Sequence, residues 1–164
     1  MALQIATLVV SIASLVVSST IAILVNRVQS RATKEATKEK ERLELYDRRF
    51  AVYLKTLEFH HALAGPREFF LTEDFRALHR DFIKVARESQ YLFDDSSGIH
   101  KLLEQLHVEA FKIKAVKENR KELPPELLTR MFEESMAALT IFNDAIPELE
   151  KQLKPYLNFQ KVLA

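Results

Sequence analysis

The first 25 residues of the chain contain no charged side chain, and no other feature restricts its fold as strongly. Residues 3–25 form a run of 23 mostly apolar residues. As an α-helix this run would measure roughly 35 Å, enough to cross a hydrocarbon core of about 30 Å. The run stops abruptly at Asn26-Arg27. The sequence therefore predicts a transmembrane helix over residues 1–25.

Two other interpretations of this segment fit less well. A cleaved signal peptide carries a basic stretch before an apolar segment of about 7–15 residues, whereas here only the α-amino group precedes the longer apolar run. A buried helix of a soluble protein is rarely this long, and many Val, Ile and Ser residues do not favour a helix in water. We therefore expect a membrane anchor.

The charges that follow the anchor predict its orientation. Residues 26–42 hold six basic and three acidic side chains, whereas the N-terminal side of the run holds none. Basic residues flanking a membrane helix favour the cytoplasmic side. We therefore expect the N-terminus outside and residues 43–164 in the cytoplasm. The absence of Cys agrees with a reducing compartment.

Polar side chains within the predicted span recur at a regular spacing. Their 3-4 spacing places them on one stripe of a helix, and they are Gln4, Thr7, Ser11, Ser14 and Ser18. Small hydroxyl residues on one face let helices approach closely and hydrogen-bond to each other. The same hydroxyls can instead bond to carbonyls of their own helix and face lipid. The stripe is a candidate helix-association site, and both interpretations stay open.

Residues 26–42 are rich in helix formers and contain no Gly or Pro, so we expect the membrane helix to continue as a basic helical stalk. Arg27, Arg31 and Lys34 are the cations nearest the predicted span. Each cation near an anionic membrane surface is worth on the order of 1 kcal/mol. These three residues are a candidate membrane-surface site. The plainer interpretation is a topology signal on a solvated face.

From residue 43 onward, apolar side chains recur at helical spacing in four stretches, which predicts an all-α, antiparallel four-helix bundle over residues 43–164. The expected inward residues are Leu43, Tyr46, Phe50, Tyr53 and Leu57; Phe75, Leu78, Phe82 and Val85; Ile99, Leu103, Leu106, Ala110 and Ile113; and Leu128, Met131, Ser135, Leu139 and Phe142.

Turn and capping residues divide these stretches. Gly65-Pro66 is expected to end the first helix, and Thr72 followed by two acids is a helix N-cap. Residues 94–98 (DDSSG) form a turn, and Pro124-Pro125 opens the fourth helix. Pro147 is expected to end or kink that helix.

The residue types give little support to catalysis. The chain has no Cys and only two Gly, which excludes a thiolate metal site and a Gly-rich phosphate loop. Its histidines form no H-E-x-x-H motif, and Glu104 with His107 is a lone Glu-x-x-His, where a di-iron bundle needs two. A net charge of +1 argues against a nucleic-acid binder. We expect no enzyme activity, no metal, no cofactor and no nucleic-acid partner.

Three segments resemble a group of uncharacterised bacterial membrane-anchored helical proteins. They are ERLELYDRRFAVYLKTLEF (residues 41–59), QYLFDDSSGIHKLLEQL (residues 90–106) and LKPYLNFQK (residues 153–161). The resemblance implies bacterial origin, membrane association and an all-helical body, and it assigns no activity. Within the first segment, Glu44 can pair with Arg48 one helical turn away, so the YDRR motif favours a structural role over recognition.

These observations predict a single-pass protein of the bacterial inner membrane that acts as an adaptor, regulator or assembly factor. Its expected partners are the lipid bilayer, an unidentified protein, and a second copy bound through the span or stalk. The alternative is a membrane-perturbing effector, such as an exclusion or defence protein whose clustered spans form a pore. A pore needs a polar face continuous through the bilayer, whereas Ile21 and Val25 interrupt the stripe.

Overall fold

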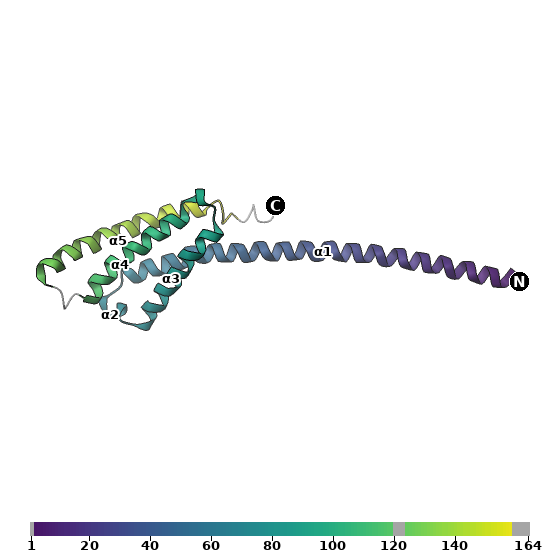
Figure 1. The fold of residues 1–164 in the computed structure, drawn as a ribbon, viewed down its shortest axis with the longest axis horizontal. Helices are drawn as coiled ribbons and strands as arrows, with labels where there is room; N and C mark the ends of the chain where they lie inside the picture. Colours follow the sequence, from purple (N-terminus) through teal and green to yellow (C-terminus); the bar gives the residue numbers. More distant parts are fainter. Residues whose placement is uncertain (1, 120–123, 159–164) are drawn as a thin grey trace. The chain divides into compact units, whose positions relative to one another are not determined.

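The computed structural model describes residues 2–119 and 124–158, and within these ranges it describes side chains from Val25 onward. All regular elements in these ranges are helical (Figure 1), which confirms the predicted all-α class. They are α1 (Ala2–Leu63), α2 (Arg67–Phe70), α3 (Glu73–Leu92), the 3-10 helix η1 (Asp95–Ser97), α4 (Ile99–Asn119) and α5 (Pro125–Leu153).

The chain divides by its internal contacts into two units, Met1–Leu43 and Glu44–Ala164. The described residues of the first unit belong to helix α1, and every side chain described in it, from Val25 to Leu43, is exposed. Among the residues that the structure describes, no helix is long and apolar enough to cross a membrane. The predicted span, residues 1–25, lies outside the described side chains except for Val25.

An aromatic core holds the second unit together. The Phe59 ring of α1 stacks on Phe82 of α3, with centroids 4.6 Å apart, and on His79 at 5.1 Å. The Phe70 ring of α2 lies 4.3 Å from that of Phe75. Full burial of one such side chain stabilises the fold by about 1.5–3 kcal/mol. The core therefore joins side chains from the second half of α1 to those of α2, α3, α4 and α5.

Capping and turn residues determine where α3 and α4 begin, as the sequence predicts. The Thr72 side chain caps α3 by accepting a hydrogen bond from the Phe75 backbone N–H at 3.3 Å. Gly98 ends η1 with φ 74°, a left-handed conformation that a residue without Cβ adopts easily. The expected inward face of α4 is confirmed, because Ile99, Leu103, Leu106, Ala110 and Ile113 are all buried.

The expected inward face of α1 is only partly right, because Tyr53 packs against the core whereas Leu43 and Phe50 are exposed. Val52, Thr56, Phe59 and Leu63 are buried, whereas Phe50 is 37% exposed. Phe50 and Phe59 are nine positions apart, so at about 100° per residue they point to opposite sides of the helix. The segment carries two apolar faces that meet at Tyr53, whose ring packs against the core and whose hydroxyl donates to Glu150 Oε1 of α5 at 2.7 Å.

Two further expectations need correction. The sequence pattern does not predict the short helix α2, which begins directly after Pro66. Its last residue, Phe70, is 1% exposed and belongs to the core. Pro147 does not end α5, which continues to Leu153. Pro147 itself is exposed, and burial of Leu149 and Leu153 stabilises the helical turns that follow it.

The expected inward face of α5 is only partly right. Ser135 and Phe142 are buried, and Leu128, Met131 and Leu139 are half-buried. The buried positions that the pattern omitted are Ala138, Ala145, Leu149 and Leu153. Two of these, Leu149 and Leu153, follow Pro147, through which the helix continues.

Candidate functional site

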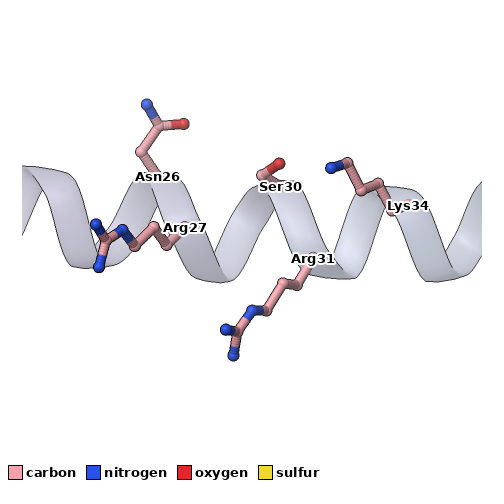
Figure 2. A pocket seen from close by; sticks show the side chains of 5 residues that line it. All are labelled: Asn26, Arg27, Ser30, Arg31 and Lys34. Atoms are coloured by element: carbon pink, nitrogen blue, oxygen red, sulfur yellow. The ribbon is translucent and has the colours of Figure 1, made fainter.

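The basic flank, Arg27, Arg31 and Lys34, lies on the fully exposed part of α1 that follows the uncharged run. Together with Asn26 and Ser30, these side chains line a shallow surface hollow. Figure 2 shows the Arg27 and Arg31 side chains one helical turn apart and pointing downward in this view. The side chains of Asn26, Ser30 and Lys34 point upward in the same view (Figure 2). Arg27, Arg31 and Lys34 are spaced i, i+4 and i+7, so the flank presents its three cations on one face of the helix.

The chemistry of this flank suits anionic oxygen atoms. A guanidinium offers five N–H donors in a planar fork that matches phosphate, and an ammonium adds a compact charge. Asn26 and Ser30 supply further donors between these cations. Because all five side chains are exposed, their charges stay solvated and act mainly through attraction. The arrangement can attract a phosphate-rich surface.

The helix-association stripe, Gln4, Thr7, Ser11, Ser14 and Ser18, lies outside the described side chains. Hydroxyls further along α1 bond to their own helix. The Thr33 Oγ1 donates to the Gln29 carbonyl oxygen at 2.8 Å, and the Thr37 Oγ1 donates to the Thr33 carbonyl oxygen at 2.9 Å. For these two threonines, the described geometry is the back-bonding that the plainer interpretation of the stripe assumes.

Arg49 of the YDRR motif fastens α1 to the far end of α3. Its Nε donates to the Leu92 carbonyl oxygen at 3.0 Å. Its guanidinium carbon lies 5.8 Å from the Phe93 ring centroid and 5.0 Å from that of Tyr156, within cation–π range. The Tyr156 hydroxyl in turn donates to Asp94 Oδ2 at 3.2 Å. We call Arg49, Leu92, Phe93, Asp94 and Tyr156 the arginine latch.

The latch joins the three segments that carry the family resemblance. Arg49 comes from residues 41–59, Leu92 to Asp94 from residues 90–106, and Tyr156 from residues 153–161. The Nη2 atom of the adjacent Arg48 lies 4.0 Å from Glu88 Oε2 of α3, and the Arg48 side chain is 58% exposed. These contacts agree with a structural role for the motif.

Two histidines, the buried His79 of α3 and the half-buried His107 of α4, lie close together away from the latch. The rings of His79 and His107 have centroids 6.2 Å apart, and neither Nε2 atom has a hydrogen-bond partner in the described structure. Burial, with Lys114 and His107 nearby, lowers the pKa of His79 to about 4. Burial also lowers the pKa of His107. Both imidazoles are therefore neutral at pH 7.

The other histidines do not join this pair. The His100 Nδ1 lies 2.9 Å from Ser89 Oγ and pins α4 to α3, and the His60 Nε2 lies 2.7 Å from Asn143 Oδ1 of α5. His61 is exposed. Among the described residues, no three His, Asp or Glu side chains come together as a metal site would require. The single Glu-x-x-His match, Glu104 with His107, stays isolated.

A second set of side-chain contacts joins α4 to the residues that lead into α2, and no sequence pattern predicts it. The Lys117 Nζ donates to the Gly65 carbonyl oxygen at 2.7 Å and lies 4.8 Å from the Phe70 ring centroid. The Arg67 Nε donates to the Lys117 carbonyl oxygen at 2.8 Å, near the end of α4. Desolvation lowers the pKa of Lys117. The Lys117 ammonium group therefore stabilises the packing of α4 against Gly65 and Phe70.

Comparisons with protein-family models, with curated proteins and with solved structures gave no match. The resemblance to bacterial membrane-anchored proteins therefore stays a prediction, and the function has to be argued from the chain itself.

Proposed function

We propose that this chain is a single-pass membrane protein that displays its helical domain as an interaction module. Residues 1–25 would cross the bacterial inner membrane with the N-terminus outside. Unit Glu44–Ala164 would lie in the cytoplasm, where it acts as an adaptor, regulator or assembly factor.

The observation that carries the proposal is the abrupt change of charge at Asn26-Arg27. No charged side chain precedes this point, and Arg27, Arg31 and Lys34 follow it on an exposed helix. An uncharged run long enough to span a bilayer followed by a basic flank is typical of an anchor whose C-terminal side is cytoplasmic. The exposed flank is available to the lipid headgroups that such an anchor would place beside it.

An interaction role is favoured over catalysis by how the reactive side chains of the second unit are used. Arg49 and His100 each hold one helix to another, and Lys117 holds α4 to the residues that lead into α2. The interior is filled with packed apolar and aromatic side chains. These groups stabilise the module, whose outer surface is left to meet a partner.

Fractionation of the full chain in a bacterial host tests the anchor. We expect the protein in the membrane pellet, where it should resist extraction at alkaline pH. A variant with Ile12→Arg and Leu15→Arg should move to the soluble fraction, because each Arg at the centre of a span costs about 2.5–3.5 kcal/mol. The matched control is Ile12→Leu with Leu15→Ile, which keeps the segment apolar. A soluble wild-type protein would overturn the proposal.

The same expression experiment separates the adaptor from the membrane-perturbing effector. An adaptor should leave membrane conductance and growth unchanged when it is overproduced. Growth arrest that depends on Ser11, Ser14 and Ser18 would instead support the effector, because these residues belong to the predicted stripe of the span.

A further inference from the structure

We propose that helix α5 binds an amphipathic, basic helix of a partner protein. The contact surface, which we call the α5 docking face, consists of Phe132 and Met136 with the acids Glu126, Glu133 and Asp144. The inference names the kind of partner for the proposed interaction role and therefore rests on that role. It concerns the second unit alone and does not depend on the anchor.

Two large apolar side chains lie at the centre of the docking face. Phe132 and Met136 are four positions apart in α5, so their side chains lie on the same side of the helix. Phe132 is 53% exposed and Met136 is 49% exposed. An aromatic ring supplies a large apolar contact area, and a methionine side chain adapts to the surface that it meets. The pair therefore suits the apolar face of another helix.

The apolar pair lies on the side of α5 that α1 covers further along. The His60 Nε2 of α1 lies 2.7 Å from Asn143 Oδ1, and the Tyr53 hydroxyl donates to Glu150 Oε1 at 2.7 Å. Met136 precedes Asn143 by seven positions, close to two helical turns, so both lie on this side. The two contacts show that α1 runs antiparallel to α5, and α1 therefore ends shortly after it passes Asn143.

Beyond the end of α1, this side of α5 is free for a partner. Figure 1 shows the first turns of α5 extending past the point where α1 ends. The next helix, α2, packs against α3 and α4. Among the described helices, none replaces α1 on this side of α5, as the exposure of Phe132 and Met136 shows. A partner helix can therefore lie against α5 beyond the end of α1.

A row of acids borders the apolar pair. Glu126, Glu133 and Asp144 follow each other at intervals of seven and eleven positions, close to whole helical turns, so they share one side of α5. All three are exposed, and none bonds to another residue that the structure describes. Arg130, on the neighbouring turn, has its Nε 3.1 Å from Glu134 Oε1 instead. The row therefore keeps its negative charge available.

This charge selects the occupant of the docking face. Lys and Arg side chains of a partner helix would meet the acids while its apolar side chains cover Phe132 and Met136. An anionic lipid surface would instead be repelled by the same acids. The combination of an apolar pair with an acidic border thus points to a basic amphipathic helix.

Binding of defined peptides to the full chain tests this inference. The probe is a fluorescent peptide of Leu and Lys whose leucines recur at i, i+3, i+4 and i+7, and the matched peptide has Glu in place of every Lys. Fluorescence anisotropy in a zwitterionic detergent, with protein-free detergent as the blank, measures both affinities. The Lys peptide should bind roughly tenfold more tightly than the Glu peptide. Equal affinities, or no binding of either peptide, would overturn the inference.

Removal of the apolar pair tests where the peptide binds. Phe132→Ser combined with Met136→Ser should weaken binding of the Lys peptide roughly tenfold or more, because the apolar contact is lost. The matched control is Val108→Ser on α4, a position that is 58% exposed. An equal loss in the control would show that the peptide binds any exposed apolar side chain, and the docking face would be wrong.

Reversal of the acidic row tests the charge assignment. Glu126→Lys, Glu133→Lys and Asp144→Lys together should invert the preference, so that the Glu peptide binds more tightly than the Lys peptide. The control variant carries the same three charge changes on exposed acids elsewhere in the second unit, at Asp47, Asp74 and Asp95. If both variants change the preference equally, net charge rather than the docking face controls binding, and the inference fails.

Two further measurements on the full chain separate the remaining alternatives. A dimer of the wild type that Phe132→Ser with Met136→Ser abolishes, seen by light scattering, would make a second copy the occupant and contradict the inference. Fractionation separates the docking face from the anchor. A soluble chain that selects the Lys peptide would support the docking face and contradict the anchor. A membrane-bound chain without this selectivity would support the anchor and contradict the docking face.

Discussion

Helix α1 has two apolar faces within the second unit, and they differ in regularity and in burial. The inner face, Val52, Thr56, Phe59 and Leu63, includes a threonine yet is almost completely buried. The outer face, with Tyr46, Phe50 and Leu57, has more regular apolar spacing, yet its Phe50 is 37% exposed. The comparison shows that regular apolar spacing does not by itself identify the buried face of a helix.

Local hydrogen bonding explains how the inner face accommodates a polar residue. The Thr56 Oγ1 donates to the Val52 carbonyl oxygen at 2.7 Å, so its hydroxyl is satisfied within its own helix. Its methyl group can then pack as an apolar group would. A hydropathy pattern counts such a residue as polar and therefore underestimates the inner face.

The largest expected difference between the two faces is in stability. Phe59→Ala should lower the free energy of unfolding by about 3–5 kcal/mol, because it leaves a cavity among stacked aromatic rings. Phe50→Ala should cost less than about 1 kcal/mol. Chemical denaturation measures both values. Equal losses would show that the faces do not differ in their contribution to the fold.

The pH dependence of stability should report on the inner face through His79, which stacks on Phe59. Its pKa is lowered from 6.5 to about 4 in the fold. The unfolded chain therefore binds a proton as pH falls through this window while the folded chain does not, so stability is retained above pH 6.5 and declines toward pH 4. We expect His79 to lower the free energy of unfolding by about 2 kcal/mol as the pH falls across this window.

Unfolding of His79→Phe at neutral pH and at about pH 4.5 measures that contribution. The variant should lose most of this decline, and the remainder should include His107, whose pKa is also lowered. His61→Phe, at an exposed position, is the matched control, since it leaves His79 and His107 intact. An unchanged pH profile for His79→Phe would contradict the assignment.

The arginine latch, where α1 meets the end of α3, should contribute less to the free energy of unfolding than Phe59 or His79. Arg49→Ala should cost about 1.5 kcal/mol, because it removes a hydrogen bond to Leu92 and cation–π contacts with Phe93 and Tyr156. Arg48→Ala, which removes an exposed contact with Glu88, should cost less than about 0.5 kcal/mol. Thermal unfolding of the two variants compares them, and equal costs would rule out the latch.

The smallest effect is expected at Thr56. Thr56→Val keeps the shape of the side chain and removes a hydroxyl that bonds only within α1, so stability should change by less than about 1 kcal/mol. Thr37→Val removes the same kind of bond on an exposed turn and is the matched control. A large loss at Thr56 alone would mean that the inner face depends on a polar contact beyond its own helix.

The sequence predicts α4 well and α1 poorly for one physical reason. Helix α4 has one apolar stripe, from Ile99 to Ile113, so its period determines its buried face. The second half of α1 has two stripes, and period alone cannot choose between them. His79 could have been recognised, because it falls between Phe75 and Phe82 on the buried face of α3.

Contacts between distant segments were beyond prediction. The arginine latch joins Arg49 to Leu92 and Tyr156, and nothing local to Arg49 identifies these partners. The Lys117 contact with Gly65 is similar. The exposed basic flank was predictable, because its position follows directly from where the uncharged run ends.

Cysteine labelling at three sites of α1 tests the central distinction most directly. In the full chain, Val52→Cys should resist a maleimide reagent, and Glu41→Cys should react quickly. Phe50→Cys should react far more quickly than Val52→Cys, because Phe50 is 37% exposed and Val52 is fully buried. If Phe50→Cys is as protected as Val52→Cys, the two faces do not differ in burial and the account is wrong.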